Sequence, residues 1–75
     1  MEITLFNEVR QALESAGLRL AGDRPQLAVE LLSTGECLAK ASCPQAQRMA
    51  LEVLIGNGRW KVAAAFGGVL LISST

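Results

Sequence analysis

The sequence contains no histidine and no tyrosine, and its only two cysteines are Cys37 and Cys43. Histidine is the side chain used most often for general acid–base catalysis, and structural metal sites need several convergent cysteine or histidine ligands. The composition therefore predicts no enzyme, no metal site, no cofactor and no small-molecule substrate. Since no signal peptide is recognisable after Met1, we expect a cytoplasmic protein with two free thiols, because disulfides are rare in a reducing compartment.

An excess of charge of either sign is also missing. Seven Lys and Arg residues balance seven Asp and Glu residues, and the two signs are interleaved along the chain. Nucleic-acid-binding proteins usually carry a clustered basic patch, so we predict no nucleic-acid partner. The apolar run 62–72 is shorter than the about 20 residues that span a bilayer, so we predict no membrane span either.

What the chain has in quantity is aliphatic residues. Hydrophobic residues make up 51% of the sequence, and most of them are Leu, Ala, Val and Ile. This composition is typical of packed helices. We therefore predict one all-α domain over residues 1–75, built from small antiparallel helical hairpins with about four helices.

The expected helix boundaries come from periodicity and from capping residues. Apolar residues recur at three-four spacing over 4–16, which is typical of one helix face. A second helix is expected to begin at Asp23, where an early proline and a glutamine complete a capping pattern. Ser42 begins the same pattern for a third helix that runs to about Ile55. The fourth is expected over 59–72.

The third and fourth expected helices carry more apolar surface than a small domain buries easily. On a helix of 100° per residue, the apolar arc of residues 46–55 covers roughly 240°. Either the other helices surround this one, or one side packs internally and the other binds a partner; the pattern favours neither interpretation. We assign partner binding to five residues of these two helices: Leu51, Ile55, Phe66, Val69 and Leu70.

The stretch 54–63 resembles the turn of a tetratricopeptide repeat. Leu54, Gly58, Trp60 and Ala63 match the large residue, turn glycine, aromatic residue and small residue of that repeat in order. Ala63 would be the small residue that lets two helices approach closely. In a chain of this size, the pattern is similar to the tetratricopeptide-like chaperones of bacterial type III secretion needle subunits.

This resemblance implies a cytosolic chaperone that cradles the amphipathic helix of a needle subunit and prevents its premature polymerisation. It also implies a second small helical co-chaperone as a partner. The alternative is a small helical protein–protein interaction or dimerisation module of another assembly. A helix-turn-helix nucleic-acid binder and an enzyme are further alternatives, which the balanced charge and the missing histidine oppose.

Overall fold

The computed structural model describes residues 4–74, in which two helices and four strands follow one another in the order αββαββ. The elements are α1 (Thr4–Ser15), β1 (Leu27–Leu31), β2 (Cys37–Ala41), α2 (Pro44–Asn57), β3 (Trp60–Phe66) and β4 (Val69–Ser74). The predicted all-α, four-helix fold is therefore wrong. The chain forms a mixed α/β fold with an antiparallel sheet.

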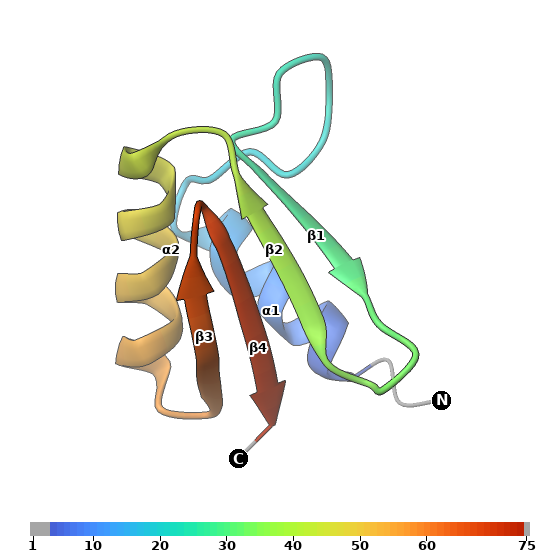
Figure 1. Cartoon of the computed structure of the whole chain (residues 1–75). Coiled ribbons are helices and arrows are strands. Elements are labelled where there is room, and N and C mark those ends of the chain that lie inside the picture. Colours follow the sequence, from blue (N-terminus) through green and yellow to red (C-terminus); the bar gives the residue numbers. More distant parts are fainter. Residues whose placement is uncertain (1–3, 75) are drawn as a thin grey trace.

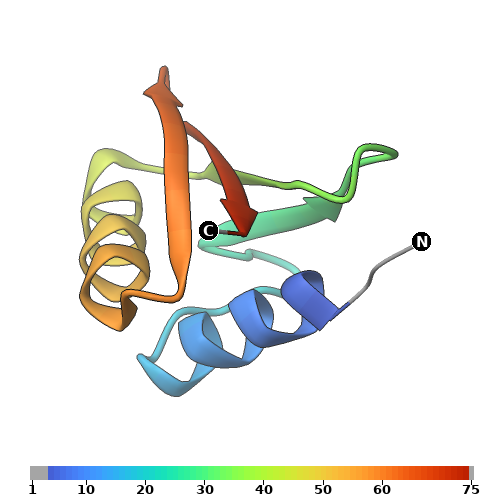
Figure 2. The same cartoon turned by 90° about the horizontal axis from the view of Figure 1, so that it is seen from below.

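The sheet has the strand order β1-β2-β4-β3. Two hairpins, β1–β2 and β3–β4, are joined side by side because β2 also pairs with β4 in antiparallel register. Both helices lie on the same side of this sheet, as the two views at right angles show (Figures 1 and 2). The molecule consequently has two layers, and the other face of the sheet is not covered by either helix.

The helices form where helical periodicity was found. In α1, Leu5, Val9 and Leu13 recur every four residues and are buried. The helix expected after Ser42 also forms, but its N-cap is Cys43, whose Sγ accepts a hydrogen bond from the Ala46 N–H at 3.4 Å. Gly58 ends this helix at φ 73°, a left-handed conformation that favours glycine.

The segment expected to be a helix from Asp23 forms the first hairpin instead. Its residues alternate in burial along β1 and β2, a period of two that fits a strand with one covered face. The apparent capping glutamine has another role: Gln26 Oε1 accepts a hydrogen bond from the Arg19 N–H at 2.9 Å. This bond closes the loop between α1 and β1, so the capping pattern there does not start a helix.

The segment 59–72 forms the second hairpin, because Gly67 and Gly68 turn the chain sharply between two strands. Their φ angles are 58° and 84°, and positive φ at both central residues is what the commonest two-residue hairpin turn requires. The tetratricopeptide-like hairpin is therefore not formed. Residues 54–63 run from the end of α2 through Gly58 into β3.

The core lies between the helices and the covered face of the sheet. α1 contributes Leu5, Val9 and Leu13, and α2 contributes Ala46, Ala50 and Leu54. The strands add Leu27, Cys37, Ala39, Trp60, Leu70 and Ile72, and Leu18 closes one end. Ala46 and Ala50 are the small residues that α2 buries in the core. Ala63, which was predicted to lie at a close contact between two helices, is exposed instead.

Candidate functional site: the open face of the sheet

The face of the sheet opposite the helices is apolar at its centre. Because directly paired residues of antiparallel strands point to the same face, the register places the outward side chains in two rows across the strands. The Phe66 row consists of Ala28, Lys40, Val69 and Phe66. The Leu71 row consists of Glu30, Leu38 and Leu71.

Together these rows form what we call the open face, with four large apolar side chains: Leu38, Phe66, Val69 and Leu71. Phe66 exposes 85% of its surface, while Leu38, Val69 and Leu71 are half-buried against one another. An aromatic side chain left in water beside three aliphatic ones is unusual for a small domain, since burying it would stabilise the fold by roughly 1.5–3 kcal/mol.

An irregularity in β3 turns Phe66 outward. Trp60 and Val62 face the core, and strict alternation would send Phe66 to the same side. A β-bulge between Val62 and Ala64 shifts the register by one residue, so that Phe66 pairs with Val69 on the open face. Bulges interrupt the hydrogen-bond ladder and re-aim side chains next to functional sites. Here the bulge exposes an aromatic ring that the core could otherwise have used.

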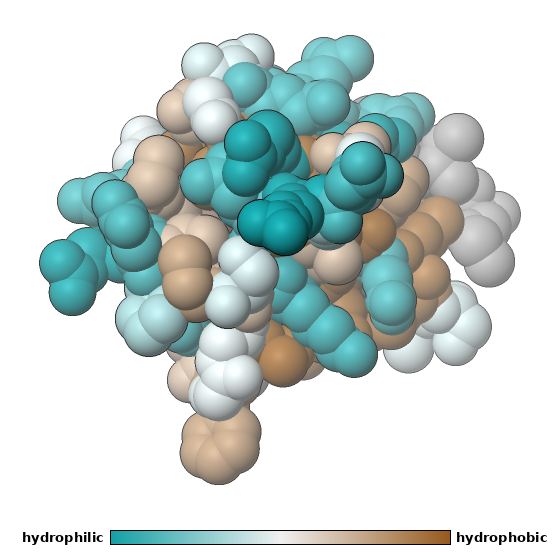
Figure 3. Space-filling view, turned by 90° about the horizontal axis from the view of Figure 1, so that it is seen from above, coloured by the Kyte–Doolittle hydropathy of each residue, from teal (hydrophilic) through white to brown (hydrophobic). Residues whose placement is uncertain are grey.

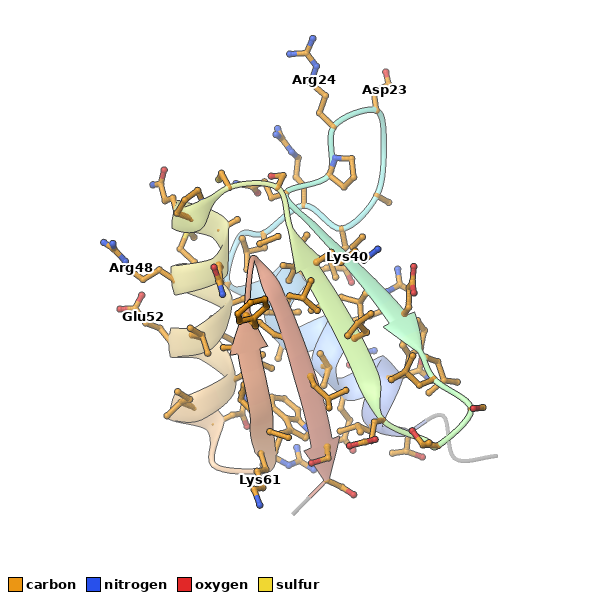
Figure 4. The ribbon with its side chains drawn as sticks, viewed as in Figure 1. Asp23, Arg24, Lys40, Arg48, Glu52 and Lys61 are labelled. Carbon is orange, nitrogen blue, oxygen red and sulfur yellow. The ribbon has the colours of Figure 1, made fainter. Side chains whose placement is uncertain are left out.

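Charged side chains border this apolar centre on three of the four strands. Glu30 on β1, Lys40 on β2 and Lys61 on β3 all point outward and are exposed. Lys40 and Lys61 lie toward opposite ends of the sheet, whereas Arg48 and Glu52 project from α2 on the other side of the molecule (Figure 4). An apolar centre with a charged rim is the usual composition of a protein–protein interface.

The structure separates the five residues predicted to bind a partner. Phe66 and Val69 lie on the open face. Leu70 is fully buried, because adjacent strand residues point to opposite faces, and its assignment to a partner surface is corrected to the core. Leu51 is half-buried against the core, and Ile55, which is 67% exposed, lies on α2 and not on the open face.

Sequence reasoning missed Leu38 and Leu71 as members of the same surface. Leu38 points to the open face of β2, whereas Leu27 and Leu31 face the core side of β1. The period-two pattern of Cys37–Ala41, with Lys40 as its polar outward position, is the signal that separates Leu38 from the core. Leu71 could be found only once Gly67 and Gly68 were recognised as a hairpin turn.

A second feature is a shallow hollow of about 430 Å³ at the end of the sheet nearest the start of α1. It is bordered by an ion pair in which Arg59 Nη2 lies 3.2 Å from Glu8 Oε2. Neither cysteine lines it. The pair ties α1 to the turn before β3.

The two thiols differ sharply in access, which gives a simple test of the fold. Cys43 is exposed at the start of α2, whereas Cys37 is buried in the sheet, and burial raises the pKa of the Cys37 thiol. Because the thiolate is the reactive form, we expect a thiol-specific chromogenic reagent to titrate Cys43 alone in the native protein and both cysteines in denaturant. Cys43→Ser should abolish the native reaction. Rapid native labelling of Cys37 would contradict the buried β2.

Within residues 4–74, no cluster of three or more acidic, cysteine or histidine side chains is arranged to hold a metal ion. In the same part of the chain, neither helix has the length and apolar character needed to cross a membrane. Seen from above, the end that carries the loop between α1 and β1 is covered mainly by hydrophilic side chains (Figure 3). The open face therefore remains the strongest candidate site.

No protein family, curated protein or solved structure was found to match this chain.

Proposed function

We propose that this domain is a protein-association module that binds through the open face of its sheet. The observation that carries the proposal is the β-bulge at Val62/Ala64, which places Phe66 outside the core and beside Val69. The bulge and the exposed ring both reduce the stability of the isolated domain, and both become favourable when another protein covers the face. Aromatic residues are enriched among those that dominate binding energy at interfaces.

The mode of binding differs from the predicted capture of a helix between helices. The apolar rows lie on a sheet, and sheets pack face to face with their side chains interdigitated at a separation of about 10 Å. An apolar sheet face of this kind suits the face of another sheet. Association needs no catalytic group, metal or cofactor, which agrees with the composition of the chain.

Chaperoning of a type III secretion needle subunit, with a helical co-chaperone, stays a prediction that nothing tests. The helical hairpin that motivated it is replaced by α2 and β3. The association module through the open face is therefore the better-supported proposal, and it retains the dimerisation alternative drawn from the sequence.

A photo-cross-linking amino acid tests the proposal in cells that produce the full chain. Benzoylphenylalanine in place of Phe66 should give a discrete covalent protein adduct on irradiation. The same amino acid in place of Ile55 is the matched control, because Ile55 is also a large exposed apolar residue but lies on α2. Adding Val69→Lys should suppress the adduct at position 66.

Absence of any adduct at position 66, or equal adducts at positions 55 and 66, would contradict association through the open face. An adduct at position 66 that still forms in the Val69→Lys variant would also contradict it, because a lysine in the centre of the apolar face should prevent close packing.

A further inference from the structure

We infer that the protein which covers the open face is a second copy of this chain, packed face to face about a two-fold axis. The inference rests on the proposed function and identifies its partner. Its basis is the arrangement of side chains in the two rows, because a surface that packs on a copy of itself must be complementary to itself.

A two-fold axis that runs across the strands, midway between the two rows, stacks each Phe66 row on the Leu71 row of the other copy. Val69 then lies over Leu71 of the second copy, and each aliphatic contact occurs twice. Phe66 lies over β3 of the second copy, where the strand continues beyond the bulge. The protruding ring of one copy therefore meets the edge of the sheet of the other.

The charges fit the same axis. Lys40 lies over Leu38 of the second copy, whose neighbour on β1 is Glu30. The long lysine side chain can reach this carboxylate across one strand spacing of about 4.8 Å. The axis repeats this pairing, so two Lys40–Glu30 pairs flank the apolar centre. Lys61 lies beyond the stacked rows, at the solvated rim.

The zero net charge of the chain also favours a second copy, because two copies approach each other without overall repulsion. The open face carries charges of both signs. A face that binds a strongly acidic or strongly basic partner would carry mainly one sign. A copy of the same face supplies both in matching positions.

The size of the face sets the expected affinity. Four strands about 4.8 Å apart, with outward rows along about five residues of 3.3 Å, give a face of roughly 20 by 17 Å. Such a patch covers roughly 340 Å² per copy, which is less than half of the about 800 Å² per partner that specific interfaces bury at standard size. We therefore expect a weak, transient dimer with a dissociation constant in the high micromolar range, on the order of 10⁻⁴ M.

The experiment uses the purified full chain and sedimentation velocity from about 1 µM to about 500 µM, a range chosen to bracket a dissociation constant on the order of 10⁻⁴ M. Lys40→Glu and Glu30→Lys should each weaken the dimer by about tenfold or more, since each places like charges together in a desolvated contact. The double variant should restore it to within about threefold of the wild type, because the pair is only reversed. Ile55→Ser on α2 is the control and should leave the dimer unchanged.

Because Glu30 and Lys40 are exposed, these variants should keep their fold, and circular dichroism at low concentration checks this. If the wild-type chain stays monomeric at the highest concentration, the inference that the partner is a second copy is wrong. Photo-cross-linking at position 66 then tests the proposed function separately. An adduct with a different protein would support the open face as an interface, and the absence of any adduct would contradict it. If both charge variants leave the dimer unchanged but Ile55→Ser abolishes it, the open face is not the dimer interface.

Discussion

Leu70→Ala should destabilise the domain far more than Phe66→Ala, although both residues belong to the same hairpin. Leu70 is fully buried, and truncating such a leucine leaves a cavity that costs about 2–5 kcal/mol. Phe66 is 85% exposed, and surface truncations usually change stability by less than about 0.5 kcal/mol. Because a core of this size supplies only roughly 3–5 kcal/mol in total, the Leu70 variant should lose most of the stability of the domain.

Urea denaturation followed by the fluorescence of Trp60 measures this difference, since Trp60 is the only tryptophan and is buried. The protein concentration should stay well below the dimer range, so that loss of association in the Phe66 variant does not contribute. Equal midpoints for the two variants would show that Leu70 and Phe66 occupy similar environments, which the strand alternation forbids.

Ala50→Leu should also destabilise the domain strongly, whereas Ala63→Leu should have little effect. Ala50 is fully buried where α2 packs on the sheet, and inserting extra methylene groups into a packed interior costs about 1–3 kcal/mol. Ala63 is exposed in β3, so a leucine there points into solvent. The same substitution at both sites removes any difference in chemistry between the two variants.

Thermal unfolding by circular dichroism measures the second pair. A larger loss of thermal midpoint for Ala63→Leu than for Ala50→Leu would indicate that position 63 is the close helix contact, as in a tetratricopeptide hairpin. That result would contradict the packing of α2 on the sheet.

The two helices were predictable from sequence for different reasons: α1 covers the core with one clear apolar stripe, whereas α2 has a recognisable start. Leu5, Val9 and Leu13 show a helical period and nothing competes with it. The start of α2 was predicted to within a residue, because Pro44 is tolerated only in the first turn of a helix. Its N-cap moved from Ser42 to Cys43, a shift that capping preferences alone do not resolve.

The strands were missed for two different reasons. The first hairpin has short strands, and the Asp23–Gln26 capping pattern outweighed the alternation in residues 27–31 and 37–41. In the second hairpin, apolar residues occupy both faces of β4, so the run 62–72 shows no period of two. The bulge in β3 disturbs the alternation further. The Gly67–Gly68 pair was the remaining hairpin signal, but it lies inside the segment 59–72 that was predicted to be one helix.

The candidate site was predicted in part because the excess of apolar residues near the C-terminal end is visible in the sequence. Phe66 and Val69, which were assigned to partner binding because of that excess, lie on the open face. Leu70 was wrongly added because neighbouring residues of a helix can share a broad face, whereas in a strand they cannot. Leu38 joins the site through pairing with Leu71 from another hairpin, a non-local contact that no local pattern predicts.

Association through the open face, and not through a helix, is the proposal on which the function of this domain depends. Amide chemical shifts of the ¹⁵N-labelled chain, recorded by nuclear magnetic resonance during dilution from the dimer range, test it most directly. Concentration-dependent shifts should be centred on Leu38, Val69 and Leu71, and the shifts of Ile55 and the outer side of α1 should stay unchanged. Shifts centred on α2, with the open face unaffected, would contradict the account.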